Sequence, residues 1–205
     1  MPSRSLHKHY HRSGFTLVEL LIAVALFSIL VSIAAGGFVR ALRSERQVSA
    51  MMSAESNVSI ALEEMTREIR TGYLFCHDPG SASPSAACAS CSVVAGGQTQ
   101  TWTCPNIEFY NANGEKVDYV LQNGLLERSD SAENGGALAV LTSNNVSVTD
   151  LGFTLFGDLE GDHWNPRITI VVGAEPNDKT VSWSTANLET TVSARNIDCT
   201  PAGSC

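Results

Sequence analysis

The chain has 205 residues and a net charge of −8, which allows one domain with a sizeable core and some additional sequence. The charge is uneven: residues 1–14 carry +3, residues 15–70 carry −1 and residues 71–205 carry −10. Because an acidic domain repels nucleic acid and this one has no basic stripe with interleaved aromatic residues, we expect no nucleic-acid partner.

The N-terminal segment joins a short, basic, acid-free stretch to a long apolar run. Residues 15–39 contain one charged side chain, that of Glu19. The run reaches the ~20 residues needed to cross a hydrocarbon core and is longer than the apolar part of a secretory signal. It therefore predicts one membrane-spanning helix, for which a plain signal anchor is the simplest interpretation. Basic residues flank it on both sides, so charge alone does not set its orientation.

A carboxylate inside this run calls for an explanation. On insertion scales it costs about 2.5–3.5 kcal/mol, so it needs a partner or a purpose. The stretch GFTLVE at residues 14–19, after a basic leader and before some twenty apolar residues, resembles the N-terminal processing motif of type IV prepilins and type II secretion pseudopilins.

That resemblance implies specific roles for three residues. It implies that a membrane-embedded aspartyl prepilin peptidase cleaves after Gly14, removing residues 1–14, and methylates the new N-terminal amine of Phe15. It also implies that Glu19 neutralises the N-terminus of a neighbouring subunit during filament assembly. The implied location is the bacterial inner membrane, single-pass with the head in the periplasm, and then a filament tip or the cell surface. The implied partners are other minor and major subunits, the peptidase and an inner-membrane assembly platform.

The helical pattern continues beyond the membrane run. We expect a transmembrane half over residues 15–39 and an amphipathic half over residues 40–72, with the helix running to about residue 70 and stopping at Gly72. The pair Gly36-Gly37 either loosens this helix or permits close packing of helices. The apolar stripe expected to face the core contains Val48, Met51, Val58, Leu62, Met65 and Ile69.

Residues 73–205 have the pattern of a β-rich globular head. Residues 76–104, rich in Ser, Ala, Gly and Pro, predict an irregular loop pinned by cysteines. Asn-Gly dipeptides at 113–114 and 123–124 predict two hairpin turns. We therefore expect an α+β fold, in which the long N-terminal helix packs on an antiparallel β-sheet, as in pilins. The strand-like runs are NIEFYN, KVDYVLQ, LLERSD, NNVSVTDLGFTLFG, RITIVVGA and LETTVSARN.

Within the family, the head pattern resembles minor subunits more than filament-forming ones. Segments such as VDYVLQNGLLERSDS are similar to the J-type minor pseudopilin or to a large minor pilin. The implied function is structural: to initiate or cap assembly of a type IV pilus or a type II secretion pseudopilus. Glu19 argues against the tip subunit type that lacks this carboxylate. One alternative is a tip-displayed, adhesin-like binding subunit that uses loop 76–104 for recognition, and another is an anchored exported protein without a filament.

Six cysteines in an exported head are expected to pair as disulfides. Cys199 and Cys205 are close in sequence and form the simplest pair. The other four would staple the 76–104 loop in one of three ways, which the sequence leaves open. They are Cys76, Cys88, Cys91 and Cys104.

The sequence offers two possible metal sites, and neither is expected to bind a metal. Zinc on the cysteines is disfavoured, because a structural Cys₄ site uses two close pairs and only Cys88 and Cys91 form one. Asp158, Glu160 and Asp162 alternate like the start of a calcium loop and are weak calcium candidates, although an acidic turn is the simpler interpretation.

No catalytic residue is predicted. The sequence contains no nucleophile elbow, P-loop or HExxH motif, and its scattered acidic residues are typical of a solvated face. We therefore expect neither an enzyme nor a cofactor.

Overall fold

The computed structural model describes residues 14–78, 85–95, 101–133, 135–157, 164–177 and 185–195. The chain divides into two compact units, residues 1–45 and residues 46–205, and each is described by itself.

One helix, α1 (Leu17–Ile69), belongs partly to each unit. No proline occurs between residues 3 and 78, so nothing interrupts the backbone ladder of this long helix. The helix ends where predicted, and Gly72 N donates to Ile69 O at 3.0 Å. A side chain at Gly72 would collide with Phe109, because a Cβ there would lie 2.5 Å from Phe109 Cδ2. The absence of a side chain thus lets the chain turn tightly against the head.

The head contains two antiparallel sheets, so the expected α+β class is confirmed but the expectation of one sheet is wrong. The strand order is β1-β2-β7-β8-β9 in the larger sheet and β3-β4-β5-β6 in the smaller. The strands are β1 (Ser92–Ala95), β2 (Thr101–Cys104), β3 (Ile107–Tyr110), β4 (Lys116–Gln122), β5 (Leu125–Asp130), β6 (Ala139–Val140), β7 (Val146–Phe156), β8 (Arg167–Pro176) and β9 (Ala186–Ser193).

The segment expected to be an irregular loop contains β1 and β2, which corrects that expectation. The two strands are four residues long each, too short for a periodic signal in the sequence. Their structure comes from pairing with distant chain: β2 runs antiparallel to β7, from Thr101 opposite Phe156 to Cys104 opposite Phe153.

Both Asn-Gly pairs lie in hairpin turns, as predicted, but the turns differ. Between β4 and β5, Asn123 and Gly124 both have positive φ, 52° and 76°, as a two-residue type I′ turn requires. Between β3 and β4 only Gly114 has positive φ, and Gly114 N donates to Asn111 O at 2.9 Å. That longer turn has the geometry of a type I turn followed by a left-handed glycine.

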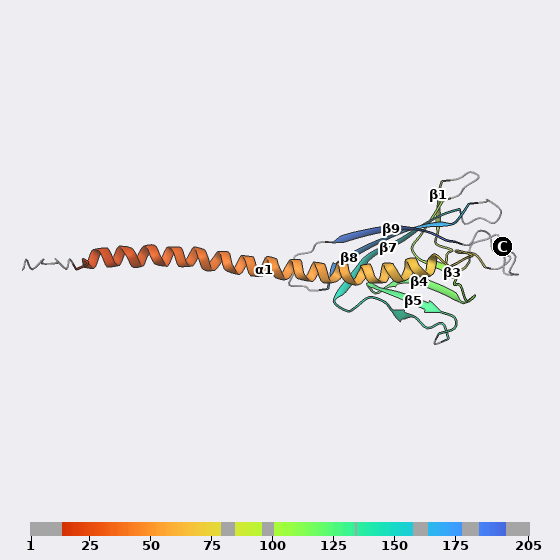
Figure 1. The fold of residues 1–205 in the computed structure, drawn as a ribbon, viewed down its shortest axis with the longest axis horizontal. Coiled ribbons are helices and arrows are strands. Elements are labelled where there is room, and N and C mark those ends of the chain that lie inside the picture. Colours follow the sequence, from red (N-terminus) through yellow and green to blue (C-terminus); the bar gives the residue numbers. More distant parts are fainter. Residues whose placement is uncertain are drawn as a thin grey trace, which may run out of the picture. The chain divides into compact units, whose positions relative to one another are not determined.

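The core lies where the C-terminal half of α1 meets both sheets, whose strands flank it in Figure 1. The predicted stripe is correct from Val58 onward, but Val48 is 50% exposed and is not part of the core. The buried face of α1 instead includes two alanines, Ala54 and Ala61, because their small side chains let a helix lie close to a sheet. The buried residues of α1 are Ala54, Val58, Ala61, Leu62, Met65 and Ile69.

Backbone hydrogen bonds tie the sheets and α1 together. Val148 N, on β7, donates to Gly124 O in the β4–β5 turn at 2.8 Å, which connects the larger sheet to the smaller one. Arg195 N, just after β9, donates to Arg70 O just after α1 at 2.9 Å. The final described segment is thereby fixed to the end of the helix.

Candidate functional site

The start of α1 is held by a threonine cap. Glu19 N donates to Thr16 Oγ1 at 3.3 Å, and Leu20 N donates to Thr16 O at 3.2 Å. Thr16 is therefore the N-cap and Glu19 is the third helical residue, the spacing of a Thr-x-x-Glu capping box. The Thr-x-x-Glu spacing is visible in the sequence and is the signal by which this cap can be predicted.

This cap places the Glu19 carboxylate in the first turn of the helix, where the unpaired backbone N–H groups favour a negative charge. Gly14 and Phe15 precede the helix in non-helical conformation, and Phe15 is 83% exposed. Exposed, non-helical chain is where proteolysis concentrates. The junction predicted for cleavage thus lies outside the helix while the carboxylate lies just inside it.

The remainder of the apolar run exposes hydrophobic side chains along its whole length in this unit, from Leu17 to Val39. α1 is the one helix within the described ranges that is long and apolar enough to cross a membrane. Its hydroxyl groups are satisfied internally: Ser28 Oγ donates to Val24 O and Ser32 Oγ donates to Ser28 O, each at 2.8 Å. Glu19 is the one charged residue of this apolar run, residues 15–39.

The glycine pair lies inside α1, and the helix continues through it without a break. A Cβ built at Gly36 or Gly37 would meet no atom within 4 Å. No contact inside this unit therefore requires glycine at either position.

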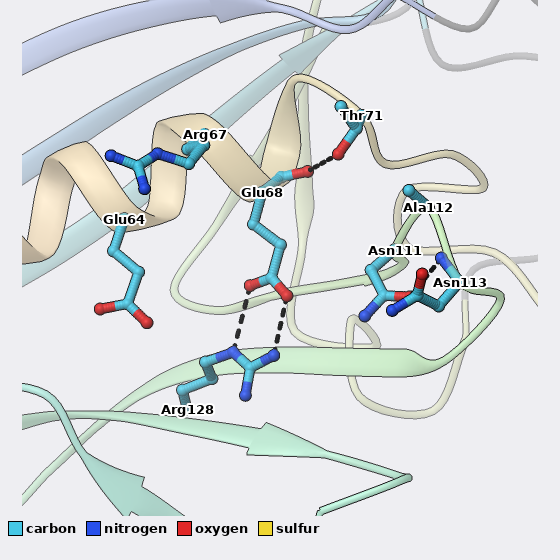
Figure 2. Close-up of a pocket in the computed structure, with 8 residues that line it drawn as sticks. All are labelled: Glu64, Arg67, Glu68, Thr71, Asn111, Ala112, Asn113 and Arg128. Atoms are coloured by element: carbon cyan, nitrogen blue, oxygen red, sulfur yellow. Dashed lines mark hydrogen bonds and ion pairs between the residues drawn. The ribbon is translucent and has the colours of Figure 1, made fainter.

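In the head, a pocket of about 420 Å³ opens at the C-terminal end of α1 (Figure 2). The helix supplies one wall, the β3–β4 turn a second and β5 a third. The lining residues are Glu64, Arg67, Glu68, Thr71, Asn111, Ala112, Asn113 and Arg128.

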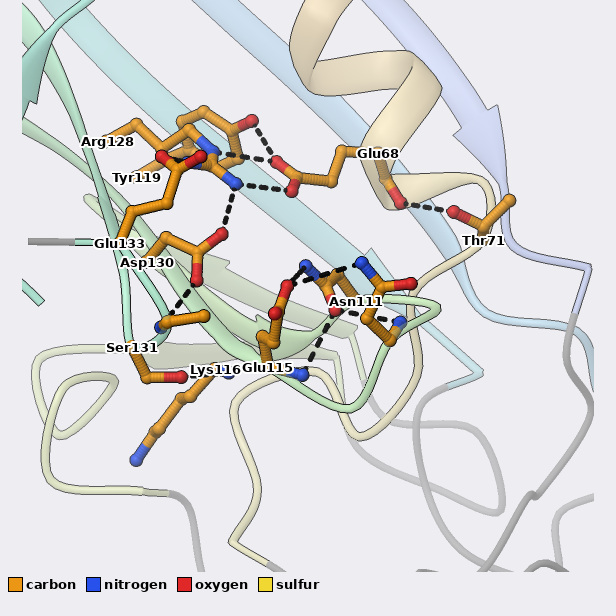
Figure 3. Close-up of polar contacts among 12 residues, drawn as sticks. Glu68, Thr71, Asn111, Glu115, Lys116, Tyr119, Arg128, Asp130, Ser131 and Glu133 are labelled. Carbon is orange, nitrogen blue, oxygen red and sulfur yellow. Dashed lines mark hydrogen bonds and ion pairs between the residues drawn. The ribbon is translucent and has the colours of Figure 1, made fainter.

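Glu68 and Arg128 form the base of an ion-pair network beside this pocket (Figure 3). The Arg128 guanidinium donates to both Glu68 oxygens, and Tyr119 Oη donates to Glu68 Oε2 at 2.5 Å. Arg128 also contacts Asp130 at 2.6 Å and Glu133 at 3.3 Å. Its hydrogen bonds with Glu68 raise the pKa of Arg128, while burial and then the Glu68 carboxylate raise the pKa of Tyr119.

Burial alone would raise the pKa of Asp130, but the backbone N–H of Ala132 and the Arg128 guanidinium outweigh it, so this pKa is lowered. Arg128 remains cationic, Asp130 remains anionic and Tyr119 keeps its proton at neutral pH. The network therefore joins α1 to the smaller sheet through fixed charges and is a structural connection between them.

A second charged group lies on β3 and β4. Lys116 Nζ is 3.0 Å from Glu108 Oε1 and 3.1 Å from Asp78 Oδ1. Burial lowers the pKa of Lys116, but the hydrogen bonds to these carboxylates outweigh it and the pKa is raised. Asp118 lies directly opposite Glu108 across the strand pair, and burial raises its pKa.

Four cysteines form two disulfides, Cys76–Cys88 and Cys91–Cys104. This selects one of the three pairings that the sequence left open. The one group of metal-ligand type among the described residues is Cys76, Cys91 and Cys104, whose sulfurs are engaged in these disulfides. The chemistry of this group is that of disulfides, which hold the segment before β3 to the framework.

Other predicted residues lie outside the described residues. They are Cys199, Cys205, Asp158, Glu160 and Asp162.

Comparison with known protein families gives a match at the N-terminus. A family described as "Prokaryotic N-terminal methylation motif" matches residues 10–35, which include the Gly14-Phe15 junction and Glu19. The chain matches no curated protein and no solved structure. It carries the N-terminal methylation motif of prokaryotic prepilin-type proteins at the start of a long apolar helix.

Proposed function

We propose that this chain is a minor pilin or minor pseudopilin that initiates or caps assembly of a type IV pilus or a type II secretion pseudopilus. The observation that carries the proposal is the position of Glu19, in the first capped turn of a helix whose other exposed side chains up to residue 39 are uncharged. The methylation motif itself supports a structural subunit of the pilin and pseudopilin type.

The mechanism is association. In the membrane, the Glu19 carboxylate costs about 2.5–3.5 kcal/mol on insertion scales. After cleavage between Gly14 and Phe15, each subunit would present an N-terminal ammonium near its own helix start. A neighbour's ammonium then neutralises Glu19, and the low dielectric strengthens this pairing. Assembly therefore removes an unfavourable charge, and this favours the assembled state over the free subunit in lipid.

The proposed function also implies where the protein is located and which partners it has. The apolar helix holds the subunit in the bacterial inner membrane with the head in the periplasm, until it joins other minor and major subunits at an assembly platform. A prepilin peptidase supplies the mature N-terminus. The minor assignment is supported by the pattern of the head, and the presence of Glu19 indicates a subunit with a neighbour above it to neutralise.

The experiment compares Glu19→Ala with the unmodified chain. Mass spectrometry should find the N-terminus of both at Phe15, one methyl group heavier. Incorporation of Glu19→Ala into filaments or tip complexes should fall by about tenfold or more, the change that corresponds to about 1.4 kcal/mol.

Two matched variants serve as controls. Glu45→Ala removes the next carboxylate along α1, and Ser28→Ala removes a polar group from the same apolar run; both should assemble normally. Normal assembly of Glu19→Ala would refute the charge mechanism. An uncleaved N-terminus, or cleavage elsewhere, would refute the prepilin assignment itself.

A further inference from the structure

The two disulfides of the head lie side by side. The sulfur atoms of Cys76, Cys91 and Cys104 all lie within 4.8 Å of one another, although they belong to two different bonds. A small side-chain rotation can therefore bring a sulfur of one disulfide onto the other. Thiol–disulfide exchange needs this kind of approach between a thiolate and a disulfide sulfur.

The four cysteines differ in access to solvent. Cys76, Cys88 and Cys104 are 4%, 1% and 1% exposed. Cys91 is half-buried, and its neighbours Ser90 and Ser92 are exposed. An external thiol consequently meets Cys91 first, while the Cys76–Cys88 bond is shielded from direct attack.

The backbone divides the four residues into two pairs. Cys76 is fixed to β3, because its N–H donates to Glu108 O at 2.7 Å, and Cys104 ends β2 opposite Phe153 of β7. Cys88 and Cys91 instead share one short turn, in which Cys91 N donates to Cys88 O at 3.0 Å. One cysteine of each disulfide thus belongs to the sheet framework and the other to the turn.

We propose that these four cysteines form one exchange unit with Cys91 as its entry point. A thiolate of an external dithiol attacks Cys91 Sγ, forms a mixed disulfide and releases Cys104 as a thiolate. Cys104 then attacks Cys76 Sγ, which forms Cys76–Cys104 and releases Cys88. The second thiol of the reagent displaces Cys91 and leaves as its own disulfide, so the head gains two electrons and loses one of its two disulfides.

The product of this exchange retains one disulfide that cross-links the head. The remaining bond, Cys76–Cys104, joins the two framework positions, so the segment between them stays closed at both ends. The released thiols are Cys88 and Cys91, a CxxC pair in a partly exposed turn. Oxidation by an exported thiol oxidoreductase would follow the same steps in reverse. Such a partner would need to reach only Cys91 Sγ in order to restore both disulfides.

The test uses the full chain in detergent under native conditions with a limiting amount of dithiothreitol. The reaction is quenched with acid, free thiols are labelled with N-ethylmaleimide and the peptides are mapped by mass spectrometry. The species that has gained two electrons should carry label on Cys88 and Cys91 and contain a Cys76–Cys104 disulfide. Label on Cys91 and Cys104, or on Cys76 and Cys88, would overturn the proposal. The same mapping in a Cys199→Ser/Cys205→Ser background assigns the signal to these four residues.

A rate comparison tests the entry point. In Cys91→Ser/Cys104→Ser, reduction of the Cys76–Cys88 bond should slow by about tenfold or more, because the accessible sulfur is gone. In the matched variant Cys76→Ser/Cys88→Ser, reduction of Cys91–Cys104 should stay within about twofold of the unmodified rate. Equal rates for the Cys76–Cys88 bond with and without Cys91 would overturn the proposal. If either variant fails to fold, the mapping of the unmodified chain decides.

Discussion

Arg128 on β5 donates to both carboxylate oxygens of Glu68 on α1, at 3.1 Å and 2.8 Å. The two residues are 60 positions apart in the chain, and their side chains are 14% and 18% exposed. The pair therefore fixes the end of the helix to the smaller sheet in a place with little solvent screening. Both residues also line the pocket at this end of α1.

Removing the cation should destabilise the head. Arg128→Met leaves the carboxylates of Glu68 and Asp130 without their cationic partner, so we expect the free energy of unfolding to fall by about 2–4 kcal/mol, near the loss from breaking a buried ion pair. The measurement is denaturant unfolding of the full chain in detergent. The matched control is Arg67→Met, which breaks the surface pair with Glu63, whose side chains are 80% and 73% exposed. That loss should not exceed about 0.5 kcal/mol, and equal losses would contradict a buried network.

Asp118 gives a pH-dependent prediction. Burial and then the Glu108 carboxylate raise its pKa, against a hydrogen bond from Asn106 and the charge of Lys116. A raised folded pKa means that the carboxyl group holds its proton more tightly in the folded state, so its ionisation lowers stability as the pH rises from the unfolded value of about 3.9 through the folded pKa.

We therefore expect Asp118→Asn to raise the free energy of unfolding at neutral pH by up to about 1 kcal/mol, the scale of a like-charge pair across two strands. The gain should vanish below about pH 3, where the unmodified carboxyl group is protonated. Unfolding curves at a series of pH values measure this. Asp150→Asn, at an exposed position, is the control; a gain that persists at low pH would rule out the charge explanation.

A substitution at Gly72 tests how tightly the turn after α1 packs against Phe109. Gly72→Ala places a Cβ 2.5 Å from Phe109 Cδ2, so we expect a loss of about 1–3 kcal/mol from overpacking. Gly36→Ala introduces the same group at a position with nothing within 4 Å and should leave the head unchanged. Thermal unfolding of the head distinguishes them, and a neutral Gly72→Ala would show that Phe109 moves freely.

The alternative function, an adhesin that uses residues 76–104 for recognition, is best tested by surface substitutions and not by deletion of this segment. Because β2 pairs with β7, a deletion of residues 76–104 would also remove strands of the larger sheet and both disulfides. Ala89→Arg/Ser90→Arg changes two exposed residues instead, and we expect assembly to remain normal. Surface attachment measured beside assembly then separates the roles: attachment lost with normal assembly favours an adhesin, whereas lost assembly indicates that this turn contacts another subunit.

The local features of the fold were readable from the sequence, and the distant ones were not. The strands around Asn123-Gly124 follow from alternation and turn chemistry within a few residues, and β4 and β5 have the predicted bounds. The split into two sheets depends on pairings such as β2 with β7, across some fifty residues, for which four-residue strands give no signal. The link between Glu68 and Arg128 joins residues 60 positions apart, and no local sequence pattern marks such a contact.

At the N-terminus the outcome was different, because function and local structure use the same residues there. The motif, its glycine junction and its carboxylate are contiguous, and the family match covers them. Thr16 is an N-cap that the sequence analysis did not predict, although the Thr-x-x-Glu spacing is a local signal for it. The disulfide pairing could not be chosen, because it depends on where β2 and β3 bring Cys104 and Cys76.

The order in which the core is made has a consequence for the nascent chain. The core begins at Ala54 on α1 and ends at Ala194 beyond β9, 140 residues later. At about 5–20 residues per second, synthesis of that interval takes roughly 7–28 s. The apolar stripe of α1 is complete near the start of this interval, whereas the strands of the two sheets are made one after another, from β1 (Ser92–Ala95) to β9 (Ala186–Ser193), so the stripe is fully covered only at its end. The apolar stripe of α1 that later packs in the head is therefore the part of the core that stays exposed longest in the nascent chain.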